Sequence, residues 1–399
     1  MTVKVSVAAA HHGAKGTKCA RFDTWFARVT YALVALKLLA SVLLSDQEGV
    51  SDTAFSILPK VIDALILLAA ISGLVVAPST KRKWRIVGSA LALVILAAAT
   101  QIISGRSMTE AAFTLAKLMA PLLLLAACVL NFGSMGSTGA SRSVVWWVLA
   151  LVAVGLFVIE PTFRNGREWA PAYFSGTHTS AYVAVFTIAL AVLAMARNWW
   201  RDSLVLPILV LMFMVVVGWG VRTAIVGGII AVAYVLFKRA TPQLKFLFLM
   251  SMLTVGLLAL LVLFSSGGIT LISLEELSSG RTTEWLNRVG RIGSRSIVQL
   301  LLGTGVGSNV TYSSVWWWEL KDSHNDFLAI IYDQGLVGLV AVIALLRSAY
   351  MLRPPSVAWN AVWLMYLSSS LLSNGLMFRP TAAGVFVLAA LAAHRSGFR

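Results

Sequence analysis

Long apolar stretches separated by short polar breaks run from residue 26 almost to the C-terminal end of the chain. A helix rises about 1.5 Å per residue, so roughly 17 to 25 apolar residues cross the hydrocarbon core of a membrane. Stretches of about this size lie at residues 26–45, 55–78, 86–103, 111–131, 144–160, 178–196, 203–219, 222–237, 246–265, 326–346, 357–374 and 380–394. The pattern predicts an all-α polytopic membrane protein of about twelve transmembrane helices.

The polar breaks also predict the domain organisation. The four parts are an N-terminal tail (1–25), helices 1–9 (26–265), a large loop (266–325), and helices 10–12 with a short tail (326–399). Long loops are usually functional. Residues 274–295 of this loop have an amphipathic pattern, with Arg281, Arg288 and Arg295 spaced seven apart and therefore near one helix face. We expect a partly helical loop between helices 9 and 10.

Composition excludes a water-soluble protein, because 59% of the residues are hydrophobic and only 12% are charged. Cys19 and Cys128 lie far apart and form no CxxC pair, which excludes a disulfide framework and a thiolate metal site. The net charge of +16 matches nucleic-acid binders. The basic residues are spread over short loops, however, as membrane topology and anionic membrane lipids require, so we expect no nucleic-acid partner.

The distribution of charge sets the orientation, because loops rich in lysine and arginine resist translocation. With the N-terminus in the cytoplasm, nineteen of the 32 lysines and arginines fall on the inner side, and thirteen of the 16 acidic residues fall on the outer side. We therefore predict a multi-pass protein of the bacterial inner (cytoplasmic) membrane. Both termini face the cytoplasm and the large loop faces the periplasm.

The outer side nevertheless carries many arginines and a single lysine, Lys321. These arginines are Arg106, Arg164, Arg167, Arg222, Arg281, Arg288, Arg291, Arg295 and Arg379. A guanidinium group presents a planar fork of donors that matches phosphate oxygens, whereas lysine serves equally well as a solvated charge. The preference for arginine indicates an anionic ligand, phosphate-bearing, on the outer face.

The end of the large loop carries the other candidate chemistry. Residues 302–307 (LGTGVG) are rich in glycine but belong to no βα unit, so we interpret them as a turn whose backbone approaches a ligand. Residues 322–326 (DSHND) precede a helix that Ser323 or Asn325 is suited to cap. His324 is a candidate general base, and Asp322 or Asp326 is placed to orient its imidazole.

The charged residues inside predicted membrane helices, where charge is costly and often functional, include Lys37, Lys60, Asp63 and Lys117. Lys60 and Asp63 are three residues apart, a spacing that allows them to pair. These residues keep a transporter open as an alternative function.

Several separated motifs resemble those of a known family. They are residues 280–285 (GRTTEW), 302–307 (LGTGVG), 324–328 (HNDFL) with 335–338 (GLVG), and the weaker 221–224 (VRTA). In this order they are similar to the Gly-Arg-Thr, glycine-rich, His-Asn and Ser-Arg-Thr elements of the O-antigen ligase and polysaccharide polymerase superfamily of bacterial membrane glycosyltransferases. Val221 stands where the family usually has serine, and residues 174–179 depart from the family's Asn-rich segment.

The resemblance implies a GT-C-like membrane fold and the transfer of a glycan from undecaprenyl pyrophosphate to an acceptor hydroxyl in the periplasm. The acceptor is lipid A core or another glycan, the anomeric carbon is inverted, and neither a metal nor another cofactor is needed. Arg222 and Arg281 would hold the pyrophosphate and His324 would accept the acceptor's proton. The expected substrate-binding set adds Arg288, Arg291, Arg295, Asn325 and Arg379.

Three other functions remain open. A polymerase would join carrier-linked repeats instead of serving lipid A core. A metal-dependent glycosyltransferase would use the acidic residues 46–52 (DQEGVSD). A polysaccharide or lipid flippase would use the charges within the helices.

Overall fold

The computed structural model of the chain describes residues 25–41, 57–131, 146–152, 177–195, 212, 221–265, 280–313, 319–372, 377 and 379–395. These residues are mostly helical. Among them, α3 (Lys81–Ser104), α4 (Met108–Asn131) and α13 (Asp326–Tyr350) are long and apolar enough to cross a membrane. Shorter apolar helices cover residues 179–193, 357–372 and 380–393. The chain is therefore a mostly helical membrane protein.

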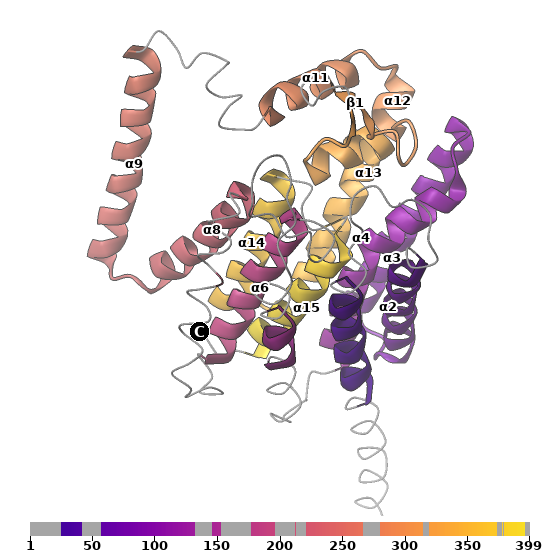
Figure 1. Ribbon diagram of the computed structural model, residues 1–399, viewed down its shortest axis with the longest axis horizontal. Helices are drawn as coiled ribbons and strands as arrows, with labels where there is room; N and C mark the ends of the chain where they lie inside the picture. Colours follow the sequence, from indigo (N-terminus) through magenta and orange to yellow (C-terminus); the bar gives the residue numbers. More distant parts are fainter. Residues whose placement is uncertain are drawn as a thin grey trace, which may run out of the picture.

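The helices pack side by side in one bundle (Figure 1). Its other members are α2 (Ile57–Val76), α6 (Thr177–Met195), α8 (Arg222–Arg239), α14 (Val357–Leu372) and α15 (Pro380–Arg395), and residues 25–41 and 146–152 are also helical. The closest partners are α2 with α4, α3 with α13, α8 with α14, and α6 with α15. A further long helix, α9 (Pro242–Ser265), follows α8 after a short turn and extends away from the bundle.

The predicted apolar stretches and the observed helices agree closely wherever the structure describes them. The predicted stretch at 326–346 begins where α13 begins, and the stretch at 357–374 corresponds to α14. Residues 203–219 lie outside the described residues except for Met212. Apolar side chains such as Leu68, Val75 and Ile102 point outward, as expected for helices solvated by lipid.

The large loop forms a small cap at one end of the bundle (Figure 1). It contains α11 (Arg281–Gly293), α12 (Ile297–Leu302) and an antiparallel hairpin of β1 (Thr311–Ser313) with β2 (Glu319–Lys321). The expected amphipathic helix ends earlier than predicted, since Ser294 is its C-cap. Arg295 therefore lies beyond α11 and does not share a helix face with Arg281.

The charges within the helices pair differently from the spacing prediction. Asp63 binds Lys37, with 2.9 Å between Oδ1 and Nζ, and both side chains are buried. Lys60 instead lies 6.0 Å from the centre of the Phe113 ring. The predicted pairing of Lys60 with Asp63 is wrong because the partner comes from a neighbouring helical segment, which spacing along one helix does not reveal.

Candidate functional site

Arg281 is the first residue of α11 and faces the bundle below it. Gly280 precedes it in the left-handed conformation (φ 79°) and turns the chain into the helix. The Arg281 Nη1 donates to the carbonyl oxygen of Leu372 at 3.4 Å, so the start of α11 rests on the last residue of α14. The side chain is half-buried.

Two arginines from distant parts of the chain lie within electrostatic range of Arg281. Arg222 is the first residue of α8, Arg379 immediately precedes α15, and both interact electrostatically with Arg281. Burial is the main cause that lowers the pKa of Arg281, and the charges of Arg379 and Arg222 lower it further, while Tyr182 and Asp322 oppose the shift. Arginine keeps its proton in proteins, so the cluster holds concentrated positive charge that a bound anion would neutralise.

Two of these arginines are also held in place by neighbouring helices. The Arg379 Nη1 donates to the Thr179 hydroxyl of α6 at 2.5 Å. Tyr182, one turn further along α6, shares a hydrogen bond of 2.8 Å with Thr223, the residue after Arg222. The arginine cluster is thereby fixed to the ends of α6 and α8, as a preorganised anion site requires.

His324 lies just before α13, in a backbone conformation that is unusual for a residue with a side chain. Its φ is 48°, and it is the only non-glycine residue with a positive φ among the residues that the structure describes. Its backbone N–H donates to Asp322 Oδ1 at 3.2 Å, and its Nδ1 lies 3.6 Å from the same oxygen. Asp322 thus holds the turn, and its carboxylate faces the imidazole.

A tryptophan connects the histidine turn to the helix that carries Arg281. The Trp285 Nε1 donates to the carbonyl oxygen of Ser323 at 2.7 Å. Trp285 is four residues after Arg281, and residues at this spacing lie on one side of a helix. The side of α11 that presents Arg281 is therefore bonded to the residue before His324, and Asp322 lies within electrostatic range of Arg281.

Asn325 is a structural residue that connects the start of α13 to the end of α14. Its Oδ1 accepts from the backbone N–H of Leu328 at 2.9 Å, so Asn325 is the N-cap of α13. Its Nδ2 donates to the carbonyl oxygen of Leu371 at 2.7 Å, next to the carbonyl that Arg281 contacts. Arg281 and the histidine turn therefore rest on adjacent carbonyls at the end of α14.

Asp326, the other carboxylate considered for orienting His324, is buried. It accepts a hydrogen bond from the backbone N–H of Met377 at 3.2 Å and interacts electrostatically with Arg379. Asp322 is therefore the carboxylate that faces the imidazole, while Asp326 joins α13 to the chain that leads into α15.

The remaining loop arginines lie apart from the cluster. Arg288 is fully buried, and its Nε donates to Glu284 at 2.5 Å while its other nitrogens bind Asn309 and Thr311. Arg291 is exposed and reaches Thr311 at 3.4 Å. Because the donors of Arg288 are used inside the loop, we assign it a role in holding α11 against β1 rather than one in substrate binding.

Arg295 is likewise engaged within the protein. Its guanidinium lies 3.8 Å from the centre of the Tyr332 ring, and its nitrogens donate to the Tyr332 carbonyl at 2.8 Å and the Thr304 hydroxyl at 3.1 Å. The stacking and the hydrogen bonds fix the end of α11 to α13. Arg295 is therefore also a positioning residue.

Replacing Arg288 with alanine is expected to destabilise the protein by about 3 to 5 kcal/mol, because the Glu284 carboxylate would remain buried without its partner. Thermal unfolding in detergent measures the effect. Arg291→Ala, on the same helix but exposed, is the matched control and should change Tm little. An unchanged Tm for Arg288→Ala would contradict the assignment.

The glycine-rich segment approaches the protein itself rather than a ligand. The backbone N–H groups of Gly307 and Asn309 donate to the Asp333 carboxylate at 3.1 and 2.7 Å, and the Ser308 hydroxyl donates to it at 3.0 Å. The expectation of a ligand-binding turn is corrected accordingly: the segment surrounds a carboxylate of α13 and locks the loop onto that helix.

Glycine is required at position 335 of α13, where the backbone of residues 301–303 lies against that helix. Gly335 interrupts α13 with φ 67° and ψ −168°, and a Cβ there would lie 2.3 Å from the Leu301 carbonyl oxygen. Gly335→Ala is expected to cost about 1 to 3 kcal/mol in backbone strain alone. Gly290→Ala, in open space on α11, should leave Tm unchanged or slightly raised. Equal Tm values for both variants would refute this account of Gly335.

The residues that connect the site were not predicted from the sequence. Trp285 belongs to a recognised motif, and its spacing from Arg281 was the available signal for a shared helix face. Tyr182 and Thr179 gave no such signal, because they lie in an apolar stretch about 40 residues before Arg222. Among the described residues, no group of three His, Cys, Asp or Glu side chains is placed to hold a metal ion, and the acidic residues 46–52 lie outside them.

Comparison with protein-family models gives no match to this chain, and comparison with curated proteins gives none either. A functional assignment therefore depends on the geometry described above and on the resemblance of the motifs.

Proposed function

We propose that the protein is an O-antigen ligase-like glycosyltransferase that moves a glycan from undecaprenyl pyrophosphate to a hydroxyl of lipid A core. The observation that supports this most strongly is the meeting of Arg281 with Arg222 and Arg379, next to the turn that carries His324. Guanidinium forks match the oxygens of a diphosphate, and an imidazole near them is suited to accept a proton.

In the proposed reaction, the pyrophosphate oxygens bind Arg281 and Arg222 beside Arg379. His324 accepts the proton of the acceptor hydroxyl as its oxygen forms a bond to the anomeric carbon. The bond from that carbon to the pyrophosphate oxygen breaks, and the electron pair leaves with undecaprenyl pyrophosphate. The arginines stabilise this charge, and attack from the opposite side inverts the anomeric carbon.

The three arginines of the proposed site fit a reaction that needs no metal. Three guanidinium groups supply the positive charge that a divalent cation supplies in other phosphate-transfer sites. Purified protein treated with EDTA should retain its transfer activity. Loss of activity on EDTA treatment with recovery on adding Mg²⁺ would favour the metal-dependent alternative.

The proposed location is the bacterial inner membrane, with the α11 cap in the periplasm and both termini in the cytoplasm. A Ser294→Cys variant without Cys19 and Cys128 should react with a membrane-impermeant maleimide in intact spheroplasts, because Ser294 is exposed at the end of α11. Lys245→Cys, at the start of α9, should react only after permeabilisation. The reverse pattern would overturn the periplasmic assignment.

The acceptor separates a ligase from a polymerase, and one assay distinguishes them. Purified protein is incubated with a carrier-linked glycan and either lipid A core or a second carrier-linked repeat. A ligase yields glycosylated lipid A core, whereas a polymerase yields a longer carrier-linked chain. Absence of both products, with a protein that is folded and monodisperse, would refute the proposed function.

A transporter is the second candidate, because Lys37, Asp63 and Lys117 interact electrostatically inside the bundle. Charges inside membrane bundles often line transport pathways. Counterflow of labelled carrier lipid or glycan in liposomes that contain only this protein would favour transport. Its absence, together with transfer in the assay above, would leave the enzyme as the remaining function.

A further inference from the structure

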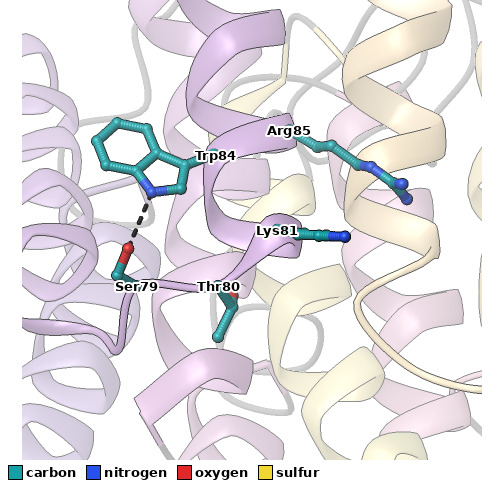
Figure 2. A pocket seen from close by; sticks show the side chains of 5 residues that line it. All are labelled: Ser79, Thr80, Lys81, Trp84 and Arg85. Carbon is teal, nitrogen blue, oxygen red and sulfur yellow. Dashed lines mark hydrogen bonds between the residues drawn. The ribbon is translucent and has the colours of Figure 1, made fainter.

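A second group of basic residues lies at the end of the bundle opposite the α11 cap. Ser79, Thr80, Lys81, Trp84 and Arg85 line an open hollow where α3 begins (Figure 2). The Arg82 Nη1 beside it donates to the Leu352 carbonyl at 2.8 Å, just past the end of α13. A helix of 25 residues spans roughly 37 Å, so α13 separates this hollow from the arginine cluster.

Two of the four basic side chains here are used to hold the fold. The Lys83 Nζ donates to the carbonyls of Ala77 at 2.8 Å and Val75 at 3.2 Å, at the end of α2. Arg82 binds the Leu352 carbonyl. Both side chains thus satisfy carbonyls at helix ends, which have no partner within their own helix.

The other two basic side chains, Lys81 and Arg85, make no hydrogen bond or salt bridge to the part of the chain that the structure describes, and both are exposed. They are four residues apart on α3 and therefore neighbours on one side of the helix. Figure 2 shows both side chains extending in the same direction from α3. Two cations in this arrangement are free to bind the same anion.

Trp84 places the hollow at the depth of lipid headgroups. Its side chain is 60% exposed, and its Nε1 donates to the Ser79 hydroxyl at 3.0 Å, which fixes the indole at the edge of the hollow (Figure 2). Tryptophan with one polar bond and an exposed ring is typical of the membrane–water interface. From residue 86 onward α3 is apolar, as expected for the part of the helix that enters the hydrocarbon.

We infer that this hollow binds the phosphate headgroup of an anionic phospholipid. Lys81 and Arg85 contact the phosphate oxygens, while the Trp84 ring, which extends from α3 in the other direction, sets the depth of the hollow at the lipid headgroups. A zwitterionic lipid carries its own ammonium group, which the two cations repel, so the site selects anionic lipids. This inference does not depend on the proposed glycosyl transfer.

Native mass spectrometry of the full-length protein tests the inference by measuring affinity for phosphatidylglycerol and phosphatidylcholine. The wild type should retain phosphatidylglycerol more strongly. Lys81→Gln with Arg85→Gln should weaken phosphatidylglycerol binding at least about 30-fold, since each bond to the charged phosphate contributes more than about 1 kcal/mol. Phosphatidylcholine binding should not change.

The matched control is Lys238→Gln with Arg239→Gln, which removes the same charge from the exposed last turn of α8. Equal losses in the two double variants would show general charge attraction and overturn the site, as would full retention in Lys81→Gln with Arg85→Gln. Competition by glycerol 3-phosphate at an affinity equal to that of the lipid would overturn the assignment to a lipid. All four substituted side chains are exposed, and unchanged Tm values in phosphatidylcholine confirm folding.

Discussion

Replacing Arg281 with alanine is expected to lower the rate of glycan transfer about 100- to 1,000-fold, the loss seen when one fixed donor to a developing negative charge is removed. Arg281 is half-buried and interacts electrostatically with both Arg222 and Arg379. Initial rates with a fluorescent carrier-linked glycan measure the effect. Arg281→Lys should also lose most activity, because lysine offers a point charge in place of the planar fork.

The control for this prediction is Arg347→Ala. Arg347 is an exposed arginine in the last turn of α13, at the far end of that helix from His324. Its rate should stay within about twofold of the wild type, and Tm values should show that all variants are folded. Full activity in Arg281→Ala would remove this residue from the proposed site.

Replacing His324 with alanine is expected to lower the transfer rate about 100- to 10,000-fold, the usual contribution of a positioned general base. Donor binding should persist, because the arginine cluster is unchanged. The wild-type rate should fall as the solution is made acidic, since a protonated imidazole cannot accept the acceptor's proton. The residual rate of His324→Ala should not show this dependence.

Asp322→Asn separates the chemistry of His324 from its placement. The asparagine amide oxygen can still accept the hydrogen bond from the His324 backbone N–H. The substitution removes the negative charge that lies 3.6 Å from Nδ1. We expect a smaller loss than in His324→Ala, with the acid dependence retained. A His324→Ala enzyme that keeps the wild-type pH profile would show that another group accepts the proton.

The positions of the helices were largely predictable, because apolar runs and polar breaks are local features of the sequence. The start of α13 at residue 326 follows from Asn325, which is a polar break and a good N-cap in one residue. The common placement of Arg222, Arg281 and Arg379 at one end of the bundle was also predictable, from the alternation of apolar stretches and polar breaks. Their meeting depends on the packing of three helices and is not encoded in any spacing.

Other parts of the site depend on partners far along the chain. Arg288 lies seven residues after Arg281, as a residue on the same exposed helix face would. It is buried because Asn309 and Thr311, which lie about 20 residues further along the chain, bind its guanidinium. The glycine-rich segment indicated a close approach of backbone to some group. That group is Asp333, which lies in an apolar stretch 26 residues after Gly307.

The carbonyl oxygens of Leu371 and Leu372 accept hydrogen bonds from Asn325 and Arg281, so backbone atoms set the distance between the histidine turn and Arg281. Every residue type supplies such an oxygen. Replacing either leucine with another apolar residue would leave these two carbonyl oxygens in place. Adding or deleting one residue near the end of α14 would turn them away from Asn325 and Arg281. Natural variants of this protein should differ freely in residue identity at these two positions and hardly at all in length.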